Sequence, residues 1–331
     1  MNITFISSSA DRLSTVLNLP NFQQLTRIKG ISFYFQKEPV PFSNIILIMG
    51  YDAKQIKKLK KQNPEAKIGI VDPRPGTSKK IISHADFIVA NGWEMKDYYA
   101  DVIPNIFIYP IYTEIPNFSR IHQKKNKICI GYHGNKVNLQ IMQPMISDAI
   151  NKLGHEIPIE IRAFYNIRNL GKLSKPICES HVKFTPVQYN EEEICDFLAK
   201  IDIGIVPNYI PSKITLLNNI KTKFYRGKFN EASNDMLVRY KCTANPGRLF
   251  FFMQTGIPIV TGTLPSTGQL IKDEHTGYLA STSGAWYQAL KKLATSAEKR
   301  NRIAQAMHEE YCERFAIPKL NYQFVDFLKT L

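Results

Sequence analysis

The chain has 331 residues, 44% hydrophobic and 21% charged, so it is long enough for about two domains that each bury a core. Its formal net charge of +15 favours anionic partners, namely nucleotide phosphates, lipid head groups, acidic glycans or nucleic acid; a generally basic, solvated surface is the alternative. The five cysteines lie far apart, no apolar run reaches the roughly 18 residues of a transmembrane helix, and the start of the chain lacks the basic residues of a signal peptide. We therefore expect a cytoplasmic protein with reduced, inert cysteines.

Residues 1–113 alternate between predicted strands and helices. Apolar runs predict strands at residues 2–6, 44–49, 67–71, 85–90 and 107–112. This alternation is typical of a parallel, doubly wound α/β domain. The helix predicted at 54–61 carries five lysines, which form either a solvated face or a basic patch facing a membrane.

Two charged residues follow the strand predicted at 67–71. They are Asp72 and Arg74, separated by a proline. Side chains at the carboxyl end of a strand in an open α/β sheet face the ligand crevice, so both residues are catalytic candidates. A salt bridge within a local turn is the alternative.

A polar, basic stretch at 117–126 predicts a linker, and a second α/β half follows it. A strand from 127 runs into His133, Gly134, Asn135 and Lys136, and a helix begins at about 137. Gly134 lets a ligand approach the backbone, and Lys136 can reach a phosphate. His133 is a third catalytic candidate, with a structural loop histidine as the alternative.

Further strands are predicted at 157–164, 182–187 and 201–206. Residues 211–241 then read as an insertion with seven Lys or Arg against two acids, mixed with aromatic residues. Such a mixture binds nucleic acid or a phosphorylated, sugar-bearing acceptor, or is a solvated loop.

Residues 241–280 predict a helix, a strand, a loop, a second helix and a loop. The first helix starts near Asn245 and ends before a glycine, and the strand covers the apolar residues 257–260. The second helix opens at 265–267, where free backbone N–H groups offer an anion site. Lys241 and Arg248 bracket the first helix and add positive charge, with a plain surface charge as the alternative for Arg248. Three amphipathic helices follow, at 284–295, 298–315 and 320–331.

Several of these segments resemble the B-type (GT-B) bacterial glycosyltransferases, most closely the group that includes family 4. The matching sequences are ADFIVANG at 85–92, IDIGIVP at 201–207, GIPIV at 256–260 and DEHTGYL at 273–279. The resemblance implies two Rossmann-like, doubly wound domains that face each other across a cleft. It places an acceptor-side domain at 1–120 and a nucleotide-sugar domain with the basic insertion at 121–310. A helix at 311–331 is expected to cross back to the first domain.

The resemblance also implies an activity. Such enzymes move a sugar from a nucleotide-sugar to a hydroxyl of a glycan or lipid-linked acceptor, without a metal or cofactor, because basic side chains and helix N-termini stabilise the leaving phosphate. For this chain it suggests bacterial surface polysaccharide synthesis at the inner face of the membrane. The donor-binding residues expected are Gly134, Asn135, Lys136, Arg239, Lys241, Asn245, Arg248, Ser266, Thr267, His275, Thr276 and Gly277.

One departure from the family pattern leaves the donor open. Many retaining members carry two glutamates before and within the helix that precedes the G-x-P strand, and here Thr243 and Phe251 stand at those positions. The nucleotide, the sugar and the stereochemical outcome therefore stay open. Two other classes remain as alternatives: a catalytically inactive GT-B scaffold or glycan-binding protein, and a basic nucleic-acid-binding protein, although no nucleic-acid motif is recognisable.

Overall fold

The computed structural model describes residues 1–7, 13–39, 41–50, 53–73, 79–116, 120–140, 142, 145–173, 177–208, 210–211, 238–239 and 244–331. Contacts within the chain divide it into two compact units. Residues 1–121, 242–256 and 301–331 form the first unit, and residues 122–241 and 257–300 form the second. The helix before the GIPIV strand thus lies with the first unit, whereas the sequence placed it in the second domain.

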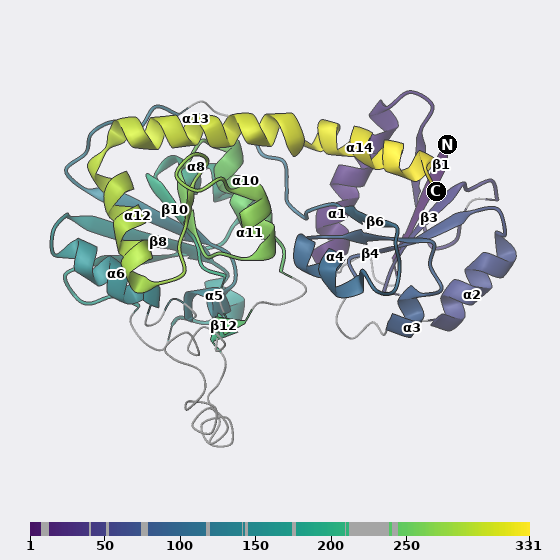
Figure 1. Ribbon diagram of the computed structural model, residues 1–331, viewed down its shortest axis with the longest axis horizontal. Helices are drawn as coiled ribbons and strands as arrows, with labels where there is room; N and C mark the ends of the chain where they lie inside the picture. The colour runs from purple at the N-terminus through teal and green to yellow at the C-terminus, as the bar shows by residue number, and fades with distance from the viewer. Residues whose placement is uncertain are drawn as a thin grey trace, which may run out of the picture. The chain divides into compact units, whose positions relative to one another are not determined.

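The first unit is built on a six-stranded parallel sheet (Figure 1). In spatial order its strands are β2 (Ser32–Phe35), β1 (Asn2–Ser7), β3 (Ile45–Met49), β4 (Lys67–Val71), β5 (Phe87–Ala90) and β6 (Ile106–Ile108). The order reverses between β1 and β3, the arrangement of a doubly wound sheet. The edge strand β2 was not predicted, because its half-buried residues lack the long apolar run of the central strands.

Successive side chains of these strands point to opposite faces of the sheet, and each face has its own core. One face packs Phe5 and Leu47 against α14 (Ile317–Lys329), with α1 (Leu13–Gln23) beside it. The other face packs Ile46 and Ile48 against α2 (Ala53–Gln62) and α4 (Trp93–Tyr99). A short α3 (Lys79–Ile82) and the 3-10 turn η1 (Gln24–Arg27) complete this unit's connections.

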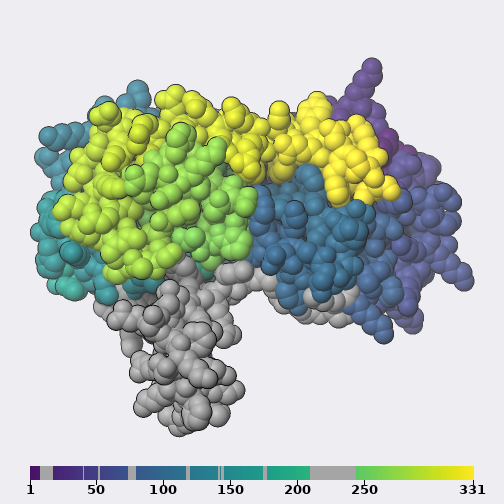
Figure 2. All heavy atoms as spheres, in the orientation of Figure 1, coloured from purple at the N-terminus to yellow at the C-terminus, as the bar shows by residue number. Residues whose placement is uncertain are grey.

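The last helix, α14, is part of the first unit's core. Phe324 is fully buried, and its ring centroid lies 5.8 Å from that of Phe22 and 5.1 Å from that of Phe107. The buried Asn321 donates to the Asn21 carbonyl at 3.0 Å and accepts from the Tyr109 hydroxyl at 2.8 Å. In the space-filling view the yellow side chains of α14 lie directly on the blue surface of this unit (Figure 2).

A second helix, α10 (Gly247–Gln254), holds the segment that follows β6. The Asn245 amide accepts from the Ile111 N–H at 3.2 Å and donates to the Ile111 carbonyl at 2.8 Å. Gln254 does the same further along, because it accepts from the Ile115 N–H and donates to the Thr113 carbonyl. The strand predicted at 107–112 ends early, at Ile108, because the backbone groups of Ile111, Thr113 and Ile115 bond to the side chains of Asn245 and Gln254 instead of to a neighbouring strand.

The second unit has its own six-stranded parallel sheet (Figure 1). In spatial order its strands are β9 (Lys183–Gln188), β8 (Ile159–Tyr165), β7 (Ile128–His133), β10 (Ile203–Val206), β13 (Ile259–Thr261) and β14 (Tyr278–Leu279). Numbered along the chain this is the order 3-2-1-4-5-6 of dinucleotide-binding folds. The helices are α5 (Lys136–Gln140), α6 (Met145–Gly154), α7 (Ile167–Leu170), α8 (Ile194–Ala199), α11 (Pro265–Leu270) and α12 (Ser283–Thr295), with the 3-10 turn η2 (Glu191–Glu193).

One long helix and one short strand pair complete the described elements of the second unit. Helix α13 (Ala297–Arg314) begins in the second unit and ends in the first. The short strands β11 (Ile210–Pro211) and β12 (Val238–Arg239) pair antiparallel at the two ends of the predicted insertion. The rest of the insertion, with its basic and aromatic residues, lies outside the described residues.

The aspartates of two family-like segments have a structural role. Asp86 accepts from the Ile68 N–H at 2.8 Å and from Lys60 Nζ at 2.9 Å. In the second unit Asp202 accepts from the Cys129 N–H at 3.0 Å and from Lys125 Nζ at 2.7 Å. Each carboxylate thus accepts from a backbone N–H near the start of the neighbouring strand. Both aspartates therefore lie at the amino edge of their sheet.

The rate at which the cysteine thiols are alkylated tests the expectation that they are inert. Burial, with the nearby Glu160 and Asp202 carboxylates, raises the pKa of Cys129 to about 12, and burial raises the pKa of Cys178 to about 12. Only the thiolate is nucleophilic, so at pH 8 both should react with iodoacetamide on the order of a thousandfold more slowly than an unperturbed thiol. Mass spectrometry of the alkylated peptides measures this. Labelling of native Cys129 at the rate of an unfolded control would contradict the described burial.

Candidate functional site

The carboxyl edge of the second unit's sheet is the best candidate for a binding site. In open α/β sheets ligands bind outside the carboxyl ends of the strands, where the strand order reverses. Here the reversal falls between β7 and β10. The residues that follow these two strands, together with those that follow β13, therefore define the candidate site.

The segment after β7 is shaped by its polar side chains. His133 is the last residue of β7 and is buried, with 5% of its surface exposed. Gly134 has φ +130°, a backbone conformation that favours glycine. The Asn135 side chain accepts from the Val137 N–H at 3.0 Å and so caps the start of α5, while its carbonyl accepts from the Tyr132 hydroxyl at 2.7 Å. The predicted strand-to-helix loop is present, but His133 belongs to the strand.

Lys136 is tied to a neighbouring loop. Its ammonium donates to the carbonyls of Leu170 at 2.8 Å and Lys172 at 2.7 Å, at and beyond the end of α7. A cation at this position satisfies carbonyls that a helix end leaves open. To reach a phosphate, Lys136 would have to give up these two hydrogen bonds.

The ends of β10 and β13 are linked by a residue that the sequence analysis did not select. Asn208 donates through Nδ2 to the Thr261 hydroxyl at 3.0 Å, and that hydroxyl donates to the Val206 carbonyl at 3.1 Å. The available signal was position alone, since Asn208 comes directly after the proline that ends a predicted strand. An amide at the switch point is well placed to recognise a polar ligand group.

The predicted anion site at 265–267 opens α11 as expected. Ser266 and Thr267 are both buried, with 2% of their surface exposed. Thr267, however, uses its hydroxyl internally: it accepts from the Leu264 N–H and donates to the Gly262 carbonyl, both at 2.7 Å. Pro265 has no N–H to offer. Thr267 thus shapes the turn, and Ser266 is buried next to it at the start of α11.

The last three of the predicted donor-binding residues, 275–277, follow α11. They come directly before β14, so they sit at the amino end of that strand. An added Cβ at Gly277 would lie 3.1 Å from Ile259 Cγ1, at the start of β13. Thr276 is buried and accepts from the Lys272 N–H at 2.8 Å, which closes the turn; His275 is exposed. These three residues therefore lie at the amino edge of the sheet, opposite the edge at which the other candidates follow their strands.

The first unit holds a second polar site, at the ends of β4 and β5. Asp72 has φ +48°, uncommon for a residue other than glycine, and is buried with 5% of its surface exposed. Its carboxylate accepts from Asn91 Nδ2 at 2.8 Å, and its backbone N–H donates to the Val89 carbonyl. Asn91 Oδ1 is buried with no hydrogen-bond partner among the described residues. Strained backbone and incompletely bonded polar atoms collect at functional sites.

The remaining predicted residues divide into three groups. Arg74 and Lys241 lie outside the described residues, and Arg239 is described by its backbone in β12 alone. Asn245 commits both ends of its amide to Ile111, so its role is structural. Arg248 lies half-buried on α10, in the first unit.

Comparisons with known proteins extend this picture. No family model matches the sequence, and a search of curated proteins finds no match. Among solved structures, the chain is similar to Anabaena Alr3699/HepE, crystallised with UDP and glucose, at 13% identity and a TM-score of 0.59 over 100% of both chains. It is also similar to a glycosyltransferase from Rickettsia africae, at 10% identity and a TM-score of 0.62 over 99% of this chain and 97% of that one.

A third similar structure is longer. A point mutant of S. aureus TarM, in complex with fondaparinux, alpha-GlcNAc-glycerol and UDP, matches at 11% identity and a TM-score of 0.53. The match covers 94% of this chain but only 58% of TarM. At these identities the likeness concerns the fold: two parallel six-stranded sheets, each with its helices. The chain therefore has the two-domain α/β fold of the GT-B glycosyltransferases.

Proposed function

We propose that this chain is a glycosyltransferase that moves a sugar from a UDP-sugar to a hydroxyl of a glycan or lipid-linked acceptor. The observation that carries the proposal is the switch point between β7 and β10, with a glycine in a positive-φ conformation directly after β7. The fold that contains this switch point is similar to that of HepE, which was crystallised with UDP and with UDP-glucose. Nucleotides bind at this position in folds of the same strand order.

The proposed donor site is formed by Gly134, Asn135, Asn208 and Ser266, together with the buried His133 at the end of β7. Backbone N–H groups around a positive-φ glycine approach a diphosphate without hindrance from a side chain. Positive charge then stabilises the leaving diphosphate, so the reaction needs no metal. Arg239 and Lys241 are the cations that we assign to this role, and Arg248 stays a predicted donor-binding residue on α10 of the first unit.

The proposed catalytic residue of the first unit is Asp72. A carboxylate at a strand end can accept the proton of the acceptor hydroxyl as that oxygen attacks the sugar. The Asn91 amide holds the carboxylate in place through the bond of 2.8 Å. Arg74 follows two residues later, and we keep it as a second candidate on the acceptor side.

Turnover of donor tests this activity. The protein is incubated with UDP-sugars and a mixture of glycan and lipid-linked acceptors, and both UDP release and labelled product are followed. The proposal requires release that depends on an acceptor. An inactive scaffold would bind a donor or glycan without release, and a nucleic-acid binder would instead give a salt-sensitive gel shift with generic DNA or RNA.

We further propose that the enzyme works in the cytoplasm, at the inner face of the membrane, in bacterial surface polysaccharide synthesis. No helix in the described part of the chain has both the length and the apolar content to cross a bilayer. Helix α2 supports a peripheral attachment, because it buries Ile56 and Leu59 and exposes four lysines: Lys54, Lys57, Lys58 and Lys61. The fifth, Lys60, bonds to Asp86.

This attachment predicts reversible binding to anionic vesicles. Each lysine near an anionic surface contributes about 1 kcal/mol, and the attraction fades within a Debye length. The protein should therefore sediment with phosphatidylserine vesicles at low salt, stay in solution with neutral vesicles, and be released near ~0.5 M salt. Replacing the four exposed lysines of α2 by glutamine should weaken binding strongly.

The control variant removes the same number of positive charges from surfaces other than α2. Exposed lysines at four sites off α2 are replaced by glutamine: Lys124, Lys200, Lys272 and Lys319. If both quadruple variants lose binding equally, net charge rather than α2 is responsible. If the unaltered protein does not sediment with anionic vesicles at low salt, the membrane attachment is wrong.

A further inference from the structure

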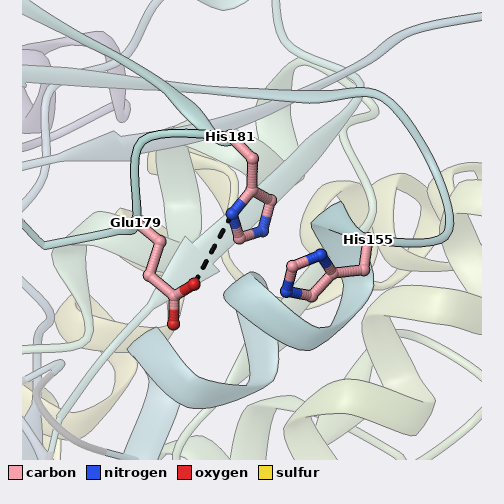
Figure 3. Close-up of side chains that lie close together, drawn as sticks. All are labelled: His155, Glu179 and His181. Atoms are coloured by element: carbon pink, nitrogen blue, oxygen red, sulfur yellow. Dashed lines mark ion pairs between the residues drawn. The ribbon is translucent and has the colours of Figure 1, made fainter.

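Three potential metal ligands meet on the surface of the second unit, away from the candidate donor site. They are His155, Glu179 and His181, all exposed, and one ligand atom of each lies within 4.8 Å of the others. Figure 3 shows the side chains converging from the end of α6 and from the loop that precedes β9. Both segments precede strands of the sheet, so the cluster is at the amino edge, opposite the carboxyl edge where a nucleotide would bind.

The two ring nitrogens of His181 face different groups. Nε2 lies 3.0 Å from the Asn151 carbonyl oxygen and donates to it, because a carbonyl can only accept. Nδ1 lies 3.6 Å from a Glu179 carboxylate oxygen, so a cation can stand between these two atoms.

The geometry suits a metal ion in that place. With Zn–N and Zn–O bonds of about 2.1 Å, two ligands of a tetrahedral zinc lie about 3.4 Å apart. The observed separation of 3.6 Å is close to this value and long for a hydrogen bond. A zinc-bound histidine usually donates its other ring N–H to a carboxylate or a backbone carbonyl, as His181 does to the Asn151 carbonyl.

His155 supplies the third ligand. Its ring stacks on that of His181, with 3.9 Å between the centroids and 20° between the planes. Because the side chain is exposed, it is free to turn its ring edge toward the Nδ1 of His181. His155 directly follows α6, whose C-terminal carbonyls favour a cation.

The surrounding residues fix the loop in a position to bind. The Asn151 side chain accepts from the Glu179 N–H at 3.0 Å. Gly154 allows close packing, since an added Cβ would lie 2.5 Å from Val182 Cγ2 and 3.1 Å from the His181 ring. The backbone of the loop is therefore docked on α6 already, and the metal has only side chains to order.

We infer that His155, Glu179 and His181 bind a divalent transition-metal ion, with zinc as the best match, and that this ion fastens the loop before β9 to the end of α6. Two imidazoles and one carboxylate suit zinc, with water in the fourth position, and do not suit magnesium, which prefers oxygen ligands. The site is structural or regulatory and is separate from the sugar-transfer chemistry.

The test is a zinc titration of the full chain, free of any affinity tag, against a chromophoric chelator. One zinc per chain is expected, with no effect of magnesium. His155→Gln, Glu179→Gln and His181→Gln should each abolish binding over the titrated range while leaving the melting temperature in EDTA unchanged. Asn151→Ala keeps the carbonyl that bonds to His181 but removes the side-chain acceptor of the Glu179 N–H, so it should weaken zinc binding by about 10–100-fold without abolishing it.

A matched control variant tests whether zinc binds at a histidine outside the cluster. His308→Gln changes the α13 histidine that lies 3.5 Å from Cys312 Sγ, and it should bind zinc as the unaltered protein does. Zinc should also raise the melting temperature, read from the fluorescence of the buried Trp286 on α12, which packs on α6. The inference is overturned if the unaltered protein binds no zinc, or if binding survives in the cluster variants and is lost in His308→Gln.

Discussion

Phe324→Ala is expected to lower the free energy of unfolding of the first unit by about 3–5 kcal/mol, the usual cost of emptying a buried phenylalanine site. Phe324 is fully buried and contacts the rings of Phe22, Phe107 and Tyr109 between α14 and the sheet. Phe22 belongs to α1 and Phe107 to β6, so we expect the cavity not to collapse fully. The loss should be large although the residue stands close to the end of the chain.

Urea unfolding measures this effect, and the chain offers both a reporter and a control. Trp93 lies in the first unit and Trp286 in the second, so replacing Trp286 by phenylalanine leaves a reporter on the unit of interest. Tyr322→Ala changes the same helix at a residue with 55% of its surface exposed, and it should cost less than about 0.5 kcal/mol. A loss below about 1 kcal/mol for Phe324→Ala would show that α14 does not complete this core.

Asp72→Asn is expected to lower kcat by about 10²–10⁴, the contribution of a positioned general base. Asparagine is the suitable replacement, because it tolerates the positive φ of this position and keeps an oxygen to accept from Asn91. The variant should therefore fold with an unchanged melting temperature and bind donor as before. Alanine would add backbone strain and confuse the two effects.

The experiment compares kcat with donor affinity and stability. Asn91→Asp, which removes the donor to Asp72, should lower kcat less than Asp72→Asn does while also leaving donor affinity unchanged. If Asp72→Asn keeps full turnover, Asp72 is not the base. A fall in melting temperature that matches the fall in activity would instead make Asp72 a structural residue.

The central strands could be predicted from the sequence because their signal, a run of apolar residues, lies within each strand itself. Central strands of parallel sheets are buried on both faces, so their apolar runs stood out, and β3, β4, β5, β7 and β10 were found close to their observed bounds. The edge strand β2 and the end of β6 were missed or misjudged. β2 is only half-buried, and the segment after Ile108 bonds to the Asn245 and Gln254 side chains, far away in the sequence.

The candidate site was predicted less completely, because a residue type does not reveal its partners. Asn245 and Lys136 were chosen as polar residues beside a predicted helix, yet both use their polar groups on backbone atoms of the protein itself. Asn91 and Asn208 carry one signal in the sequence, a position just after a predicted strand, and many asparagines in plain turns share it. The histidine cluster was also missed, because His155 and His181 lie far apart in the sequence and form no metal-ligand spacing.

The central claim is that the carboxyl edge of the second sheet binds a UDP-sugar. The most direct test is a thermal-shift panel of UDP-, GDP-, ADP- and CMP-sugars, with sulfate as an anion control for the +15 charge, followed by hydrogen exchange with the best ligand. The account predicts that a UDP-sugar raises the melting temperature in proportion to the logarithm of its concentration and protects amides at 131–138 and 206–208. Equal shifts from sulfate and every nucleotide, or protection elsewhere in the chain, would contradict it.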